Sequence, residues 1–206
     1  GDLIIPQSVG YIGDRAFSGC GGFDGNFILS YLGSPDDYLG YNITNLESIG
    51  AFAFAGCSGL NGNINIPDSV SGGVGQYAFL DCTGLDGFIS IGYGVTVIEQ
   101  GMFQGCSNIT GYNDDLLIRR YVTNINQDAF KGCYGLSGSI TIGGASASSI
   151  QTDAFLGCDF KELIVPSWSS LVNNGDYDYF DDRALKLTFD TAVTGILDYA
   201  FDNYNF

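Results

Sequence analysis

The chain has 206 residues, of which 45% are apolar and 15% are charged, and its 23 acidic and 7 basic residues give a net charge of −16. This composition supplies enough apolar side chains for a core and excludes a disordered chain, while the excess of negative charge disfavours nucleic acid and anionic membrane surfaces as partners. Because the chain contains no histidine, catalytic pairs of serine or cysteine with histidine are excluded.

The chain opens on the apolar residues Leu3, Ile4 and Ile5, without the basic and apolar regions of a signal peptide. No run of 18 apolar residues follows, so we expect no membrane insertion in this segment. The opening reads as the middle of a repeat rather than as a polar terminal cap. We therefore expect any signal peptide or anchor to lie outside this segment, and either further repeats in the parent protein or end-to-end self-association between copies.

A short sequence motif, I-G-x-x-A-F-x-G-C, recurs along the chain and defines its period; we call each copy of it a phrase. It is written IGDRAFSGC at 12–20 and IGAFAFAGC at 49–57. Self-similarity at a fixed period is the signature of a repeat array. We therefore predict a single solenoid over residues 1–206 with about eight turns, a lateral insertion near 33–45 and a degenerate repeat near 166–182. Intervals of 24 to 27 residues, with a first interval of 37 and a last of 46, separate the phrase phenylalanines Phe17, Phe54, Phe79, Phe103, Phe130, Phe155 and Phe201.

Alternating apolar residues follow each phrase, and this period of two predicts short strands with one buried face. A second apolar pair, such as Val95/Ile98, precedes the next phrase, so each turn should hold two extended segments. Between Ile and Cys we expect a short helical or 3₁₀ turn whose phenylalanine fills the interior. Glycines after Ile and before Cys should mark bends with positive φ. The predicted strands centre on Leu3/Ile5, Phe27/Leu29, Ile64/Ile66, Ile89/Ile91, Leu116/Ile118, Ile140/Ile142, Leu163/Val165 and Leu185/Leu187.

The six cysteines occupy the same slot of successive turns, so their side chains should point inward in parallel. A disulfide scaffold or a metal cluster would be the alternatives. Parallel neighbours do not readily satisfy the disulfide dihedral, and tetrahedral zinc needs ligands that converge from different directions. We predict free, buried thiols, and no metal or other cofactor, at Cys20, Cys57, Cys82, Cys106, Cys133 and Cys158.

The lines LIIPQSVGYIGDRAFSGC (3–20) and LNGNINIPDSV (60–70) resemble the BspA-like leucine-rich repeat surface proteins, and the resemblance covers nearly the whole chain. It implies a right-handed leucine-rich-repeat solenoid, mainly of parallel β-structure. It also implies a place on the surface of a host-associated bacterium or protist, and a role in adhesion or protein–protein contact. The inserted glycine in GLNG, GLDG and GLSG and the loss of proline from several strands depart from the family pattern.

An extended scaffold without a catalytic constellation favours a non-catalytic binding module, extracellular or at the cell surface, with a host or neighbouring-cell protein or glycan as its partner. The alternative is a glycan-acting enzyme on a parallel β-solenoid, with Asp114/Asp115 or Asp176/Asp178 as paired carboxylates. The acidic loop is also a weak calcium candidate, although a solvated loop is the simpler interpretation. The loop carboxylates are Asp176, Asp178, Asp181 and Asp182.

If the alternating isoleucines face inward, the residues between them form an outward row on the sheet. In that row or next to it, Phe88, Leu117 and Arg119 supply an aromatic, an aliphatic and a charged side chain, the combination that dominates interfaces. We therefore predict the binding surface there, with Asn65, Ser90 and Thr141 as its small polar members. Further tyrosines expected to be exposed beside the irregular loops are Tyr38, Tyr41, Tyr177 and Tyr179.

Overall fold

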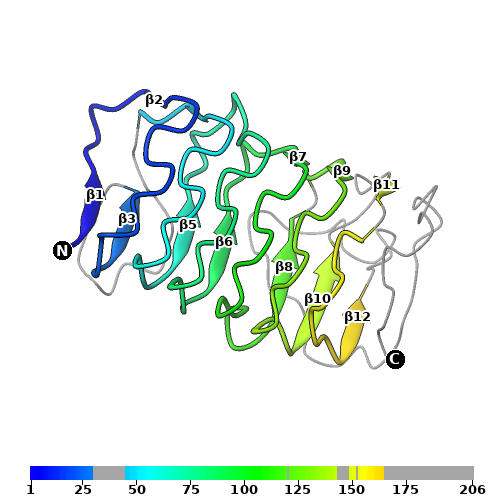
Figure 1. The fold of residues 1–206 in the computed structure, drawn as a ribbon. Helices are drawn as coiled ribbons and strands as arrows, with labels where there is room; N and C mark the ends of the chain where they lie inside the picture. The colour runs from blue at the N-terminus through cyan, green and yellow to red at the C-terminus, as the bar shows by residue number, and fades with distance from the viewer. Residues whose placement is uncertain (30–44, 120, 143–148, 152, 165–206) are drawn as a thin grey trace.

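A computed structural model describes residues 1–29, 45–119, 121–142, 149–151 and 153–164. The described residues coil into an elongated solenoid, with residues 3–5 at one extreme and residues 162–164 near the other (Figure 1). Short strands follow its length in two rows. The predicted insertion near 33–45, except residue 45, the degenerate repeat near 166–182 and the strand at 185–187 lie outside the described residues.

The first row, which we call the long sheet, contains the alternating apolar residues of each repeat. All its strand pairs are parallel, and each strand pairs with the one from a neighbouring turn, as Asn65 with Ser90 and Leu117 with Thr141. This confirms the predicted strands within the described residues. The row consists of β1 (Leu3–Ile5), β3 (Phe27–Leu29), β5 (Ile64–Ile66), β6 (Ile89–Ile91), β8 (Leu116–Ile118), β10 (Ser139–Ile142) and β12 (Glu162–Ile164).

The second row consists of two-residue strands, each ending on the isoleucine that opens a phrase. These pairs are parallel as well, as Ile12 with Ile49 and Ile98 with Ile125, and Val74 continues the row through a single bridge to Ile49. The strands are β2 (Tyr11–Ile12), β4 (Ser48–Ile49), β7 (Val97–Ile98), β9 (Asn124–Ile125) and β11 (Ser149–Ile150).

The expected helical turn between Ile and Cys is wrong. The N–H groups of Ala16, Ser18 and Cys20 donate to carbonyls three residues earlier, as in consecutive β-turns. The N–H groups between them donate instead to the next phrase, as Phe17 to the carbonyl of Ala53 at 2.7 Å. A helix would keep its N–H groups within its own segment, whereas this alternation also joins successive turns.

The position before each Cys is confirmed as a positive-φ position, with Gly56 at 73° for example, and before Cys82 it is occupied by Asp81 at 55°. The expected positive φ at the glycine after Ile is wrong. Gly75, which follows Val74 at the same position of its repeat, has no positive φ, and a Cβ there would lie 2.4 Å from the Ala51 nitrogen. Its hydrogen permits close approach of two turns. The second positive-φ slot lies two residues before the phenylalanine, where the chain has Arg15, Phe52, Tyr77, Gly101, Asp128 and Asp153.

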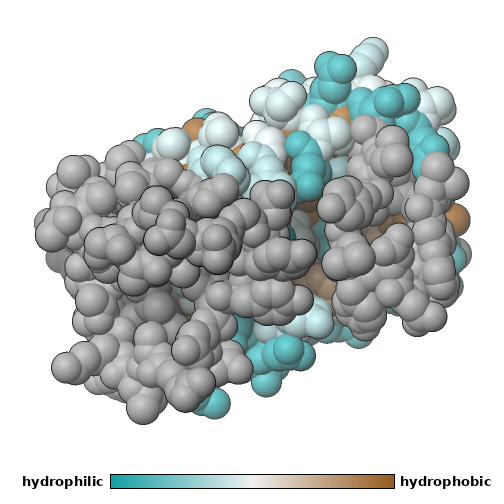
Figure 2. Space-filling model, turned by 180° about the vertical axis from the view of Figure 1, so that it is seen from behind, coloured by the Kyte–Doolittle hydropathy of each residue, from teal (hydrophilic) through white to brown (hydrophobic). Residues whose placement is uncertain are grey.

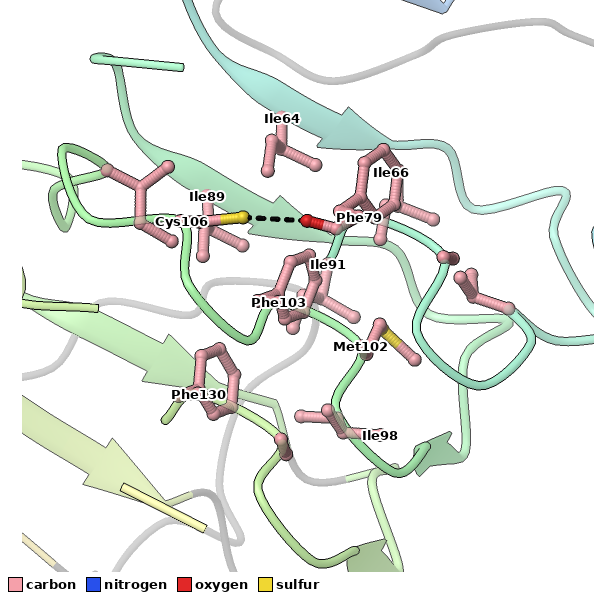
Figure 3. Close-up of a cluster of buried hydrophobic side chains, with 14 of the residues drawn as sticks. Ile64, Ile66, Phe79, Ile89, Ile91, Ile98, Met102, Phe103, Cys106 and Phe130 are labelled. Atoms are coloured by element: carbon pink, nitrogen blue, oxygen red, sulfur yellow. Dashed lines mark hydrogen bonds between the residues drawn. The ribbon is translucent and has the colours of Figure 1, made fainter. Parts of the chain in front are cut away.

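The phenylalanines form a stack through the centre of the solenoid. Phe54, Phe79, Phe103, Phe130 and Phe155 are fully buried, with ring centroids 5.1 to 5.6 Å apart and interplanar angles of 6 to 20°. The inward isoleucines of both strand rows surround these rings (Figure 3). Because Phe54, Phe79, Phe103 and Phe130 each lie between their counterparts in the two neighbouring turns, the core is continuous along the described solenoid.

The first turn is more open than the interior ones. Leu3 and Ile5 are buried, but Ile4 is 56% exposed and Phe17 is only half-buried. The interior phenylalanines of the same slot have neighbours on both sides, while Phe17 stacks on Phe54 alone among the described residues. The expected end-to-end contacts between copies stay a prediction.

Candidate functional site

The predicted binding row lies on the outward side of the long sheet. Asn65, Ser90 and Leu117 are half-buried at the centres of β5, β6 and β8. Thr141 is only 8% exposed, because β10 pairs with β8 on one side and with β12 on the other. Among the side chains that the structure describes, the accessible part of this row therefore ends near Leu117.

The long sheet is reduced to single bridges at two places, between β3 and β5 and between β6 and β8, and the second carries the candidate site. Phe88 forms a parallel bridge with Thr110, and the chain then turns outward until Tyr112 bridges Asp115 in the antiparallel sense. The turn uses two non-glycine residues with positive φ, Asn113 at 51° and Asp114 at 72°. The longer interval of 27 residues between Phe103 and Phe130 is thus taken up by this loop, which adds side chains to the sheet face.

Phe88 and Tyr112 form an aromatic pair at the start of β6 and β8. Their ring centroids are 5.4 Å apart and their planes lie at 86°, an edge-to-face contact. Tyr112 remains 51% exposed, while Phe88 is half-buried. We call these two residues the Phe88–Tyr112 pair.

A second group, the Tyr93 cluster, lies where β6 and β8 end. It consists of Tyr93, Arg119 and Tyr121. The guanidinium carbon of Arg119 lies 4.5 Å from the ring centroid of Tyr93, and the Tyr93 and Tyr121 rings meet edge-to-face at 5.5 Å. Tyr93 and Tyr121 are 42% and 39% exposed, so the cluster presents two aromatic rings to solvent, with the half-buried Arg119 packed against the Tyr93 ring.

The sequence placed Phe88, Leu117 and Arg119 in one cluster, but the structure distributes them along the strand direction. Phe88 precedes β6 and contacts Tyr112, whereas Arg119 follows β8 and contacts Tyr93. Leu117 lies at the centre of β8, between these two contacts. The sequence analysis missed the three tyrosines of this surface. Their signal was available: Tyr93 and Tyr121 stand in the turn after the strand, in IGYGV and IRRYV.

Several acidic side chains bind the backbone of the next turn. Asp14, Asp68 and Asp115 each accept an N–H bond, from Ala51, Tyr93 and Ser139 respectively, at 2.7 to 2.8 Å. Such charge-assisted bonds fasten one turn to the next. For Asp115, one member of the proposed carboxylate pair Asp114/Asp115, the geometry therefore supplies a structural role. Asp176, Asp178, Asp181 and Asp182 lie outside the described residues, as do Tyr38, Tyr41, Tyr177 and Tyr179.

The prediction of free thiols is confirmed: all six cysteines are unbridged, and all but Cys20 are buried. The S–H group of Cys106 donates to the Phe79 carbonyl of the preceding turn at 3.0 Å (Figure 3). Each later cysteine repeats the contact one period on, as Cys133 does with Phe103. Within the described part of the chain, no group of three cysteine, aspartate or glutamate residues could hold a metal ion.

Burial should make these thiols unreactive. It raises the pKa of Cys57 to about 12 and that of Cys133 well above its usual range, so both remain protonated at pH 8 to 9. Treating the native protein with iodoacetamide at pH 8 should label Cys20, which is half-buried, and leave the five buried thiols unmodified. Peptide mass spectrometry with and without urea checks this, and rapid native labelling of Cys82 or Cys106 would contradict it.

The parallel strand rows, the stacked phenylalanines and the one-period register together define a leucine-rich-repeat solenoid. The chain belongs to the family of BspA type leucine-rich repeat regions, whose model matches in six copies over residues 41–138 and 112–206. This confirms the resemblance drawn from the phrases. No curated protein matches the chain.

Solved structures share the architecture. A leucine-rich repeat protein of T. pallidum is 23% identical with a TM-score of 0.62, over 79% of this chain and 68% of that one. A leucine-rich cell surface protein of Faecalibacterium prausnitzii is 29% identical with a TM-score of 0.51, over 59% of this chain but only 30% of that one. The matched part of this chain therefore spans less than a third of the Faecalibacterium chain. Within its described residues, no helix has the length and apolar character needed to cross a membrane.

Proposed function

We propose that the chain is a non-catalytic binding module, secreted or displayed at the cell surface, that binds a protein partner on the outward side of the long sheet. The observation that carries the proposal is the arrangement of the Phe88–Tyr112 pair and the Tyr93 cluster at opposite ends of β6 and β8. Exposed aromatic and arginine side chains are the residues that dominate protein interfaces. The cell-surface description of the Faecalibacterium relative supports the location.

The scaffold suits this task because its backbone is ordered before the partner arrives. The parallel strands, and the backbone hydrogen bonds between the repeated motifs of successive turns, fix the positions of the two aromatic groups relative to each other, with Leu117 between them. A partner that lies across the strands then binds with little loss of scaffold freedom. Since the chain carries a net charge of −16, a partner surface with basic residues would also be attracted at long range.

The proposal is tested by removing one side chain from each group. The double variant Phe88→Ala/Arg119→Ala should weaken partner binding by at least about tenfold, because it removes one aromatic and one charged contact. Folding should remain nearly intact, since Phe88 and Arg119 lie outside the buried core. The partner is first captured from host matrix or a lysate of co-resident cells, and its Kd for each variant is then measured by surface plasmon resonance.

Tyr134→Ala is the matched control, because Tyr134 is 66% exposed but belongs to neither aromatic group. Its affinity should equal that of the wild type. Unchanged affinity in the double variant, combined with loss of binding on deletion of residues 33–42, would move the site to the predicted lateral insertion and overturn the proposal.

A further inference from the structure

A groove of about 670 Å³ crosses the second row of strands, away from the aromatic groups of the long sheet. Its walls come from β2, β4 and residues 71–76, and from Thr96, Val97 and Glu99 of the following turn. The row to which it belongs runs along the upper part of Figure 1, where β2 and β7 are labelled. The volume falls in the range of small-molecule binding sites.

The groove exists because one outward-facing position of this row is occupied by a glycine, Gly73, which has no side chain. The register places Tyr11, Ser48, Gly73 and Val97 in equivalent positions of successive turns. A Cβ at Gly73 would meet no atom within 4 Å, so the slot opens directly to solvent. Two turns away, with Ser48 in between, the groove is lined by Tyr11, which is 74% exposed. The groove thus combines a backbone floor at one end with an accessible aromatic ring at the other.

The chemistry of the lining selects against anions. None of the lining residues is basic, while Asp14 and Glu99 contribute carboxylates. Both carboxylates already accept hydrogen bonds, from the Ala51 N–H and the Asn126 amide, which reduces what they offer to a cation. The other polar side chains of the groove are neutral hydroxyl and amide groups, namely Ser48, Ser71, Thr96 and Gln76.

We propose that this groove binds a neutral oligosaccharide. Sugar hydroxyls donate and accept hydrogen bonds, which matches a lining of hydroxyls, an amide and acceptor carboxylates. The apolar face of one sugar ring would stack on Tyr11, as apolar groups do on aromatic rings. Two strand spacings, about 10 Å, separate the slots of Tyr11 and Gly73, so a second ring would lie over the glycine floor. This site is independent of the protein-binding face proposed above.

The test is a calorimetric titration of the full chain with a series of neutral tetrasaccharides that differ in hexose and linkage. At least one should bind, and Tyr11→Ala should weaken that binding by about tenfold through loss of the stacking ring. Gly73→Asn should also weaken it, because the new side chain fills the floor, and asparagine tolerates positive φ better than other non-glycine residues.

Tyr134→Ala controls for loss of an exposed tyrosine, and Phe88→Ala/Arg119→Ala separates this site from the long sheet; both should bind the saccharide like the wild type. Circular dichroism verifies that each variant is folded. If Gly73→Asn does not fold, Tyr11→Ala alone decides the outcome. The inference is overturned if no tetrasaccharide binds at concentrations on the order of 10 mM, or if binding persists unchanged in Tyr11→Ala. It is likewise overturned if spermine, titrated in parallel, is the only ligand whose binding depends on Tyr11.

Discussion

Replacing Phe103 by alanine should lower the free energy of unfolding by about 3 to 5 kcal/mol, the cost of deleting a buried phenylalanine. The ring is fully buried and lies in the middle of the stack, 5.6 Å from the Phe79 ring and 5.1 Å from the Phe130 ring. Its loss removes aromatic contacts to both neighbouring turns and opens a cavity in the continuous core. Urea denaturation followed by circular dichroism measures the change.

Tyr134→Ala is the control, since an exposed tyrosine should contribute about 0.5 kcal/mol or less. The position along the stack provides a second comparison. Phe17 is only half-buried and stacks on Phe54 alone among the described residues, so Phe17→Ala should cost less than Phe103→Ala. Equal losses at the two positions would argue against a core whose contribution depends on having neighbours on both sides.

Gly75→Ala should destabilise the protein by about 1 to 3 kcal/mol or more through overpacking against the adjacent turn. The added Cβ would lie 2.4 Å from the Ala51 nitrogen and 2.7 Å from its Cα, and backbone atoms cannot move aside as a side chain end can. The same contact that leaves no room for a methyl group is the one that lets Gly75 donate its N–H to the Ile49 carbonyl at 2.8 Å.

Gly13→Ala is a matched control, because Gly13 holds the same slot after Ile in the first turn. A Cβ there would meet no atom within 4 Å, and neither glycine has a positive φ. Its effect should stay within about 0.5 kcal/mol, or be slightly stabilising through the unfolded state. If thermal unfolding shows equal losses for both substitutions, intrinsic backbone preference rather than close approach would explain the glycine.

The exposed slots of the repeat are where this chain varies. The inward slots of the phrase are filled mainly with phenylalanine, alanine and cysteine, and these side chains are buried within the interior turns. The outward slots of the second row carry residues as different as Tyr11, Ser48 and Gly73. This separation lets a rigid core support surfaces of different chemistry, and it is why we place both proposed binding sites on outward slots. Seen from behind, the described surface is mostly hydrophilic to neutral with small hydrophobic areas (Figure 2).

The sequence by itself determined the repeat, the two extended segments of each turn and the inward direction of the phrase phenylalanines and cysteines. These features depend on which slot of a turn is buried, and a slot that recurs every 24 to 27 residues must stack on its counterparts. The free thiols followed from the same reasoning, because identical slots place parallel side chains beside one another.

The tertiary structure alone decided how neighbouring turns meet. The alternation of N–H donors in the phrase, the left-handed conformation of Phe52 and Tyr77 and the close approach at Gly75 all arise from pairing with the adjacent turn. The recurring glycine marks its position in the sequence, but the sequence did not show that close approach, rather than positive φ, requires it. The same holds for the candidate site. The outward loop after Thr110 brings Tyr112 to Phe88, and Arg119 reaches Tyr93 rather than Phe88. The pattern of apolar residues identifies which positions of a turn face the core. The contacts between residues some 24 to 26 positions apart depend instead on the register of the stacked turns.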